Sequence, residues 1–158
     1  RQRQMCIRDR DMAVVWGEGA RRSETIARLP MRWIGSEQQS LAWRAHSAEP
    51  LPLIMFDTPC PFHTAGTEAL SRQGIDWRVA FTSSSLPGLA AATQAGLGYT
   101  IRTRLGLQAG TCVLDEQHLG LPELPSIALT LRYQQAERSV AVERLSRIVL
   151  QAIKQHLE

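Results

Sequence analysis

The chain has 158 residues, of which 44% are hydrophobic, and its 18 basic and 15 acidic side chains give a formal net charge of +3. This length suffices for one ordinary domain or two small lobes, and the scattered basic residues argue against nucleic-acid binding by this segment. The three cysteines lack CxxC spacing, so neither a disulfide framework nor a zinc site is expected. No stretch approaches the roughly 20 apolar residues of a membrane span, so a membrane protein is not expected.

The N-terminal third begins with RQRQMCIRDR, residues 1–10, which resembles a stray string without the apolar core of a signal peptide. We expect a disordered tail there. Residues 11–17 (DMAVVWG) form a buried-strand pattern with no neighbouring strand before it, so the chain is expected to begin inside a domain. Residues 26–35 predict a strand around Pro30, and residues 36–49 a polar loop.

Residues 51–104 contain the strands of a predicted parallel sheet. The apolar run 51–56 lacks alternation, which is typical of a strand buried on both faces of such a sheet. Further strands are predicted at 77–81 and 99–104. Helices between them make right-handed crossovers the expected connection.

Two helices are predicted between these strands. Pro61 opens the first, whose apolar positions recur at helical spacing, and Gly74 ends it. Ser83, Ser84 and Ser85 offer N-cap oxygens ahead of the second, an alanine-rich helix that Gly96 closes.

The C-terminal part predicts two more strands and a helix. A short strand is expected at 111–114 among glycine-rich turns, and Pro125 precedes another at 126–133. Residues 138–157 carry an apolar stripe at helical spacing, which predicts an amphipathic helix.

The stretch WRVAFTSSSLPGLAAATQAGLGYTIRTR, residues 77–104, resembles the effector-binding domain of LysR-type transcriptional regulators. In that family a stretch close to tS.sl.gl.aAv.aGLGvt marks the second regulatory lobe. The matching residues here are Thr82, Ser83, Ser85, Leu86, Gly88, Leu89, Ala91, Ala92, Ala95, Gly96, Leu97, Gly98 and Thr100. The phrases PLPLIMFDTPCPF, DWR and GLPELP are most similar to the subgroup of motility and virulence repressors. The resemblance covers residues 11–157.

This resemblance implies an α/β fold like that of type 2 periplasmic binding proteins, with two lobes, parallel-rich sheets and hinge strands. Residues 11–36 and 125–158 would form an incomplete first lobe, and residues 37–124 the second lobe. Residues 1–10 would be a tail outside the family.

The function implied by the resemblance is that of a sensor in a bacterial transcriptional regulator. The chain would bind a small molecule between its lobes and control a winged helix-turn-helix domain, absent from this chain, through which alone the intact protein contacts DNA. A homodimer or homotetramer of the full-length protein, a cytoplasmic location, no cofactor and no membrane contact are also implied. The alternative is a fragment of a solute-binding protein from a transport system, which has the same fold.

We expect the effector site at the carboxyl ends of the parallel strands, where helix N-termini present unpaired N–H groups. The candidate residues are Thr82, Ser83, Ser84, Ser85, Leu86, Phe62, His63, Thr100 and Arg102. Helix capping explains one serine, and another can hydrogen-bond an effector carboxylate. Arg102 can pair with an anionic effector, although a solvated strand end explains it equally well.

Neither catalytic residues nor metal ligands are expected. The serine run lacks the GxSxG spacing of a nucleophile elbow, and Gly96 and Gly98 precede a strand, whereas a dinucleotide fingerprint opens a helix. Cys60 and His63 lack the second pair of ligands that a zinc site requires. An enzyme is therefore not expected.

Overall fold

The computed structural model describes residues 10–38, 43, 48–57 and 60–157. The chain divides into two compact units, one made of residues before 30 and after 125, the other of residues 30–125. The first lobe expected from the sequence reached residue 36. The boundary of the first unit falls earlier because strand β3 (Arg32–Ser36) pairs within the second unit. Most of the expected tail lies outside the described residues.

Three strands form the sheet of the first unit, in the order β1 (Met12–Trp16), β8 (Ser126–Tyr133) and β2 (Ser23–Pro30). β1 runs antiparallel to β8, with Met12 opposite Tyr133 at one end of the pairing. The central strand β8 is the most buried of the three, because it has a partner on each side.

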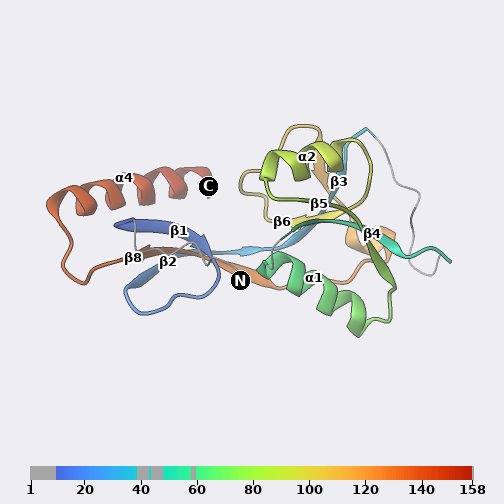
Figure 1. Ribbon diagram of the computed structural model, residues 1–158, viewed down its shortest axis with the longest axis horizontal. Coiled ribbons are helices and arrows are strands. Elements are labelled where there is room, and N and C mark those ends of the chain that lie inside the picture. The colour runs from blue at the N-terminus through green and yellow to red at the C-terminus, as the bar shows by residue number, and fades with distance from the viewer. Residues whose placement is uncertain (1–9, 39–42, 44–47, 58–59, 158) are drawn as a thin grey trace. The chain divides into compact units, whose positions relative to one another are not determined.

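Helix α4 (Val140–Leu157) is the only helix in the described part of this unit (Figure 1). The Ser139 hydroxyl accepts a hydrogen bond from the backbone N–H of Val142 at 3.3 Å, so the helix begins after a serine cap instead of at the predicted residue 138. Leu145 belongs to the apolar stripe of residues 138–157 but is 49% exposed. Among the described helices, none is long and apolar enough to span a lipid bilayer.

The second unit is built around strand β4 (Leu51–Phe56), which confirms the predicted buried strand. β4 is parallel to β5 (Trp77–Ser83), as the sequence predicted, with a register shift after Leu53. On its other edge β4 bonds to Tyr99: the Ile54 N–H donates to the Tyr99 carbonyl at 2.8 Å, and the Tyr99 N–H donates to the Pro52 carbonyl at 2.9 Å.

The chain leaves Tyr99 into β6 (Thr100–Arg102), which pairs antiparallel with β3, and β3 pairs antiparallel with β7 (Thr111–Val113). The second unit therefore holds a parallel pair, β4 with β5, and an antiparallel three-stranded sheet, β6-β3-β7, which an isolated bridge between Leu53 and Tyr99 joins. The predicted strand 26–35 is divided at Met31 into β2 and β3. The short helix α3 (Glu116–Leu119) follows β7.

Two helices cover the sheet of the second unit from opposite faces (Figure 1). Helix α1 (Pro61–Arg72) contacts β6, and α2 (Leu86–Gln94) contacts β3, β4 and β5. Pro61 stands in the first turn of α1, and Gly74 adopts a φ of 66° just after its end, as predicted from the sequence. This arrangement brings the start of α1 to the carboxyl end of β4.

Glu116, at the start of α3, is a largely buried carboxylate. Its side chain is 12% exposed, and its Oε1 atom lies 3.7 Å from Nη1 of Arg32 without accepting a hydrogen bond from any described residue. Burial raises the pKa of Glu116 above its ordinary value, and the negative charge of Glu123 adds to this shift. Arg32 and a hydrogen bond from the Trp33 backbone oppose the shift only in part. The folded chain therefore binds this proton more tightly than the unfolded chain does.

We expect the Glu116→Gln variant to show a weaker dependence of stability on pH. The raised pKa gives a stabilisation that is complete below the unfolded pKa and is lost as pH rises through the folded pKa. Glutamine carries no titrating proton, so it removes this loss. Urea unfolding at about pH 5, 6 and 7 measures how the free energy of unfolding changes with pH. These values lie above the ordinary glutamate pKa of about 4.3, where the loss of stability occurs. Glu68→Gln, on the exposed side of α1, is the control, and identical profiles for Glu116→Gln and the unsubstituted chain would contradict the expectation.

Candidate functional site

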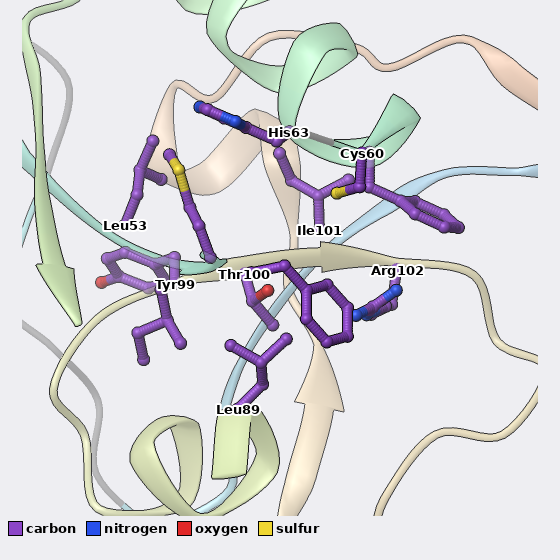
Figure 2. A pocket seen from close by; sticks show the side chains of 12 residues that line it. Leu53, Cys60, His63, Leu89, Tyr99, Thr100, Ile101 and Arg102 are labelled. Carbon is purple, nitrogen blue, oxygen red and sulfur yellow. The ribbon is translucent and has the colours of Figure 1, made fainter. Parts of the chain in front are cut away.

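A pocket lies in the second unit, between α1, α2 and the carboxyl ends of β4 and β6 (Figure 2). Its interior space is small, about 20 Å³, enough for about one water-sized group. The lining residues are Leu53, Ile54, Met55, Phe56, Cys60, Phe62, His63, Leu89, Tyr99, Thr100, Ile101 and Arg102. Most of these side chains are apolar, and Arg102 is the only arginine or lysine among them.

The start of α1 supplies two polar side chains to this pocket. Cys60 is the N-cap residue of α1, in an extended conformation, and its side chain makes no capping hydrogen bond. His63 follows in the first turn of the helix. In Figure 2, the Cys60 sulfur points from the start of α1 toward the strand that carries Thr100 and Arg102, and the His63 side chain extends sideways from the same helix.

The Arg102 guanidinium packs against two aromatic rings. Its Cζ atom lies 4.6 Å from the centroid of Phe56 and 4.9 Å from that of Phe62. Burial lowers the pKa of Arg102 from its ordinary value, and the Coulombic effect of Cys60 opposes this shift. The Nε atom is buried and finds no hydrogen-bond acceptor in the described part of the chain. Among the described residues, two aromatic ring faces flank the guanidinium, while its Nε lacks an acceptor.

His63 and Tyr99 form the other polar part of the lining. The His63 ring meets the Trp77 ring edge to face, with centroids 6.2 Å apart. Tyr99 is 2% exposed, and burial raises the pKa of its phenol. No group of three or more His, Cys, Asp or Glu side chains that could hold a metal ion occurs in the described ranges.

The serine run adjoins the pocket without lining it. Ser83 is the last residue of β5 and stands opposite Phe56 in the strand pairing. Ser85 caps α2, its hydroxyl accepting from the Gly88 N–H at 3.2 Å, as predicted. The Ser83 hydroxyl accepts from the Ser85 N–H at 3.2 Å and is committed to the same turn.

The predicted site residues thus fall into two neighbouring groups. Four line the pocket, namely Phe62, His63, Thr100 and Arg102, and the run 82–86 lies at the end of the adjacent strand. Sequence reasoning missed Phe56 and Tyr99. It predicted Cys60 to be a small buried filler or a neighbour of the helix cap, and Cys60 is the N-cap residue of α1 and also lines the pocket. Phe56 could have been identified, because it is the last apolar residue of a strand whose carboxyl end was expected to face the ligand.

Replacing Ser85 by alanine should lower the free energy of unfolding by about 1 kcal/mol, because the N–H of Gly88 loses its capping acceptor. Ser84→Ala is the matched control: Ser84 is exposed and should change stability by no more than about 0.5 kcal/mol. Thermal and urea unfolding of both variants measure the difference. Equal effects of the two substitutions would show that the cap contributes nothing.

Comparison with known proteins identifies the relatives of this chain. The family described as LysR substrate binding domain matches residues 4–154, so the match extends into residues 1–10, which the sequence predicted to lie outside the family. The HTH-type transcriptional regulator DgdR of Burkholderia cepacia is 33% identical over 116 residues, which are 73% of this chain and 38% of that protein. The chain thus spans about two fifths of the length of this curated relative.

Two of the solved structures similar to this chain are a DNA-bound regulator and a regulatory domain. Vibrio fischeri DarR, solved in complex with DNA, is similar with a TM-score of 0.66 and 18% identity, over 89% of this chain and 50% of that chain. The bromide-bound regulatory domain of HypT from Salmonella typhimurium has a TM-score of 0.68 and 14% identity, over 92% of this chain and 73% of that chain. These matches show the fold predicted for the chain, and the transport-protein alternative gains no support from them. The relatives are transcriptional regulators and not enzymes, and the chain belongs to the LysR substrate binding domain family.

Proposed function

We propose that this chain is the effector-sensing part of a LysR-type transcriptional regulator and that its effector binds at the Arg102 pocket. The observation that carries the proposal is a buried guanidinium Nε that has no acceptor among the described residues, at the carboxyl ends of parallel strands. Ligands of open α/β sheets bind at such ends. An anionic effector would supply the acceptor that Nε lacks.

The serine run belongs to the same proposal as a second contact region. Ser83 adjoins Phe56 across the strand pairing, and Thr82, Ser84 and Leu86 are exposed beside it. A direct hydrogen bond from a serine to a charged effector group would make the corresponding alanine variant bind the effector about tenfold to a hundredfold more weakly. Measuring effector affinity beside stability in Ser83→Ala and Ser85→Ala separates this contact from capping alone.

For the intact protein we propose a cytoplasmic homodimer or homotetramer that binds DNA through a separate N-terminal domain and has no catalytic activity of its own. The family membership and the regulators it resembles support this, as does the complex of DarR with DNA. Binding of an effector can change DNA affinity only through a difference in its affinity for two states of the regulator. The difference in effector affinity between the two states therefore limits how much the effector can change DNA affinity.

The experiment uses the full-length regulator that contains this chain. Metabolites are first screened by thermal shift, and those that bind are then tested for their effect on the affinity of the regulator for genomic DNA fragments that it selects. The proposal predicts that a stabilising metabolite changes DNA affinity, and that Arg102→Gln loses this response whereas Arg104→Gln keeps it. A metabolite response that is equal in both variants would contradict the assignment of the pocket.

A further inference from the structure

Residues 115–122, which follow β7 and include helix α3, are tied to the start of β3 at both of their ends. At one end the Leu114 N–H donates to the Trp33 carbonyl at 2.9 Å, and at the other the Pro122 carbonyl accepts from Trp33 Nε1 at 2.8 Å. Between these ends α3 has only four residues, and none of them is buried. Leu121 and Pro122, beyond the helix, are buried and hold the segment in place. A segment with so little buried helix surface is of the kind that opens locally.

Glu116 is the group in this segment that opposes the closed arrangement. Its side chain is 12% exposed, and its separation of 3.7 Å from Arg32 is too long for a hydrogen bond. A hydrogen bond from the Trp33 backbone favours the charged carboxylate, whereas the negative charge of Glu123, further along the chain, disfavours it. A carboxylate that loses water without full replacement is less stable charged than protonated. Closing the segment is therefore less favourable when Glu116 is ionised.

The same segment holds groups at the point where the chain enters and leaves the second unit. Trp33 has no exposed surface, so its indole N–H reaches water only when the Pro122 carbonyl moves away. Pro125 is the last residue of the unit, and its carbonyl accepts the Met31 N–H at 3.1 Å. Movement of residues 115–122 would therefore reach both crossings of the chain.

We propose that residues 115–122 form a pH-sensitive flap on the start of β3. When Glu116 is protonated the flap stays closed. When Glu116 is ionised the flap opens more often, so that the carboxylate is hydrated and the Pro122 carbonyl leaves Trp33. The proton acts as the regulating ligand, because it binds the closed state more tightly than the open state. The flap contributes no residue to the lining of the Arg102 pocket, so the inference goes beyond the proposed function.

Hydrogen exchange of the 158-residue chain, followed by nuclear magnetic resonance without any effector, tests the flap. The probes are the Trp33 indole N–H and the amides of Leu119 and Leu121, which donate to the Asp115 and Glu116 carbonyls. Exchange is measured at about pH 4.5 to 7, above the ordinary glutamate pKa of about 4.3, and corrected for its intrinsic pH dependence. Protection of these probes should fall as pH rises, by at most about tenfold per pH unit, the limit for one linked proton.

Low concentrations of urea distinguish opening of the flap from unfolding of the whole unit. The amides of Ile54 and Tyr99, which bond β4 to the chain entering β6, are the reference. A local opening exposes little surface, so the flap probes should be less protected than the reference amides and less sensitive to urea. Equal protection and equal urea sensitivity of the two sets would show that the flap never opens alone, and would overturn the inference.

Two glutamine variants test whether Glu116 is the titrating group. Glu116→Gln keeps the shape of the side chain but cannot ionise, so protection of the flap probes should no longer depend on pH. Glu123→Gln removes an exposed carboxylate close by and should keep most of the pH dependence. Circular dichroism checks the fold of both variants. A pH dependence that persists in Glu116→Gln, or that Glu123→Gln abolishes as completely, would reject the flap and leave the proposed sensor untouched.

Discussion

Trp33→Ala is expected to cost about 3 to 5 kcal/mol of unfolding free energy, the range for a large buried aromatic side chain. Trp33 has no exposed surface, lies opposite Ile101 in the pairing of β3 with β6, and donates a buried hydrogen bond from its Nε1 to the Pro122 carbonyl at 2.8 Å. Alanine leaves a cavity and an unpaired carbonyl. A loss of this size approaches the total stability of many domains, so the second unit is expected to be largely unfolded under mild denaturant.

The matched control for this prediction is Trp77→Ala. Trp77 is only partly buried at the start of β5 and makes an edge-to-face contact with His63, a pair worth about 0.5 to 1.5 kcal/mol beyond area burial. Urea unfolding followed by circular dichroism compares the two variants. If both lost the same stability, Trp33 would not be the centre of the core.

Gly98→Ala is expected to cost about 1 to 3 kcal/mol and to separate β4 from the chain that enters β6. A Cβ atom at Gly98 would stand 2.7 Å from the Pro52 carbonyl oxygen and 3.0 Å from its carbon. Both atoms belong to the backbone, so no side-chain rotation relieves the clash. The same Pro52 carbonyl accepts the Tyr99 N–H, and this bond lies beside the pocket wall.

Hydrogen exchange distinguishes this local effect from a general loss of stability. In Gly98→Ala the amide protons of Tyr99 and Ile54 should lose protection first, because their hydrogen bonds hold the two segments together. Gly74→Ala serves as the control: it strains a residue with a φ of 66° but meets open space at the end of α1. Preserved protection of Tyr99 and Ile54 in Gly98→Ala would contradict the proposed clash.

Local signals predicted the local parts of the fold. The uninterrupted apolar run of β4, Pro61 at the start of α1, the Gly74 stop and the Ser85 cap each depend on residues close in sequence, and the structure confirms them. The family resemblance, also carried by a continuous stretch, predicted the fold class that the comparisons show.

Long-range pairing could not be predicted in the same way. The antiparallel pairing of β3 with β6, and the division of one predicted strand at Met31, depend on partners far along the chain. The contact of Arg102 with Phe56 and Phe62 likewise arises only once β4, α1 and β6 have been assembled. From the sequence alone, Arg102 could therefore equally well bind an anionic effector or lie at a solvated strand end.

The most direct test of the sensor assignment is a nuclear magnetic resonance titration of the isotope-labelled chain with the metabolites that stabilise it. The account predicts saturable shifts of the backbone amides of Phe56, Cys60, Phe62, His63 and Arg102, which line one pocket. Shifts confined to the separate hollow that Trp43, Glu49 and Asp76 help to line, or shifts of no pocket residue at any saturating concentration, would contradict it.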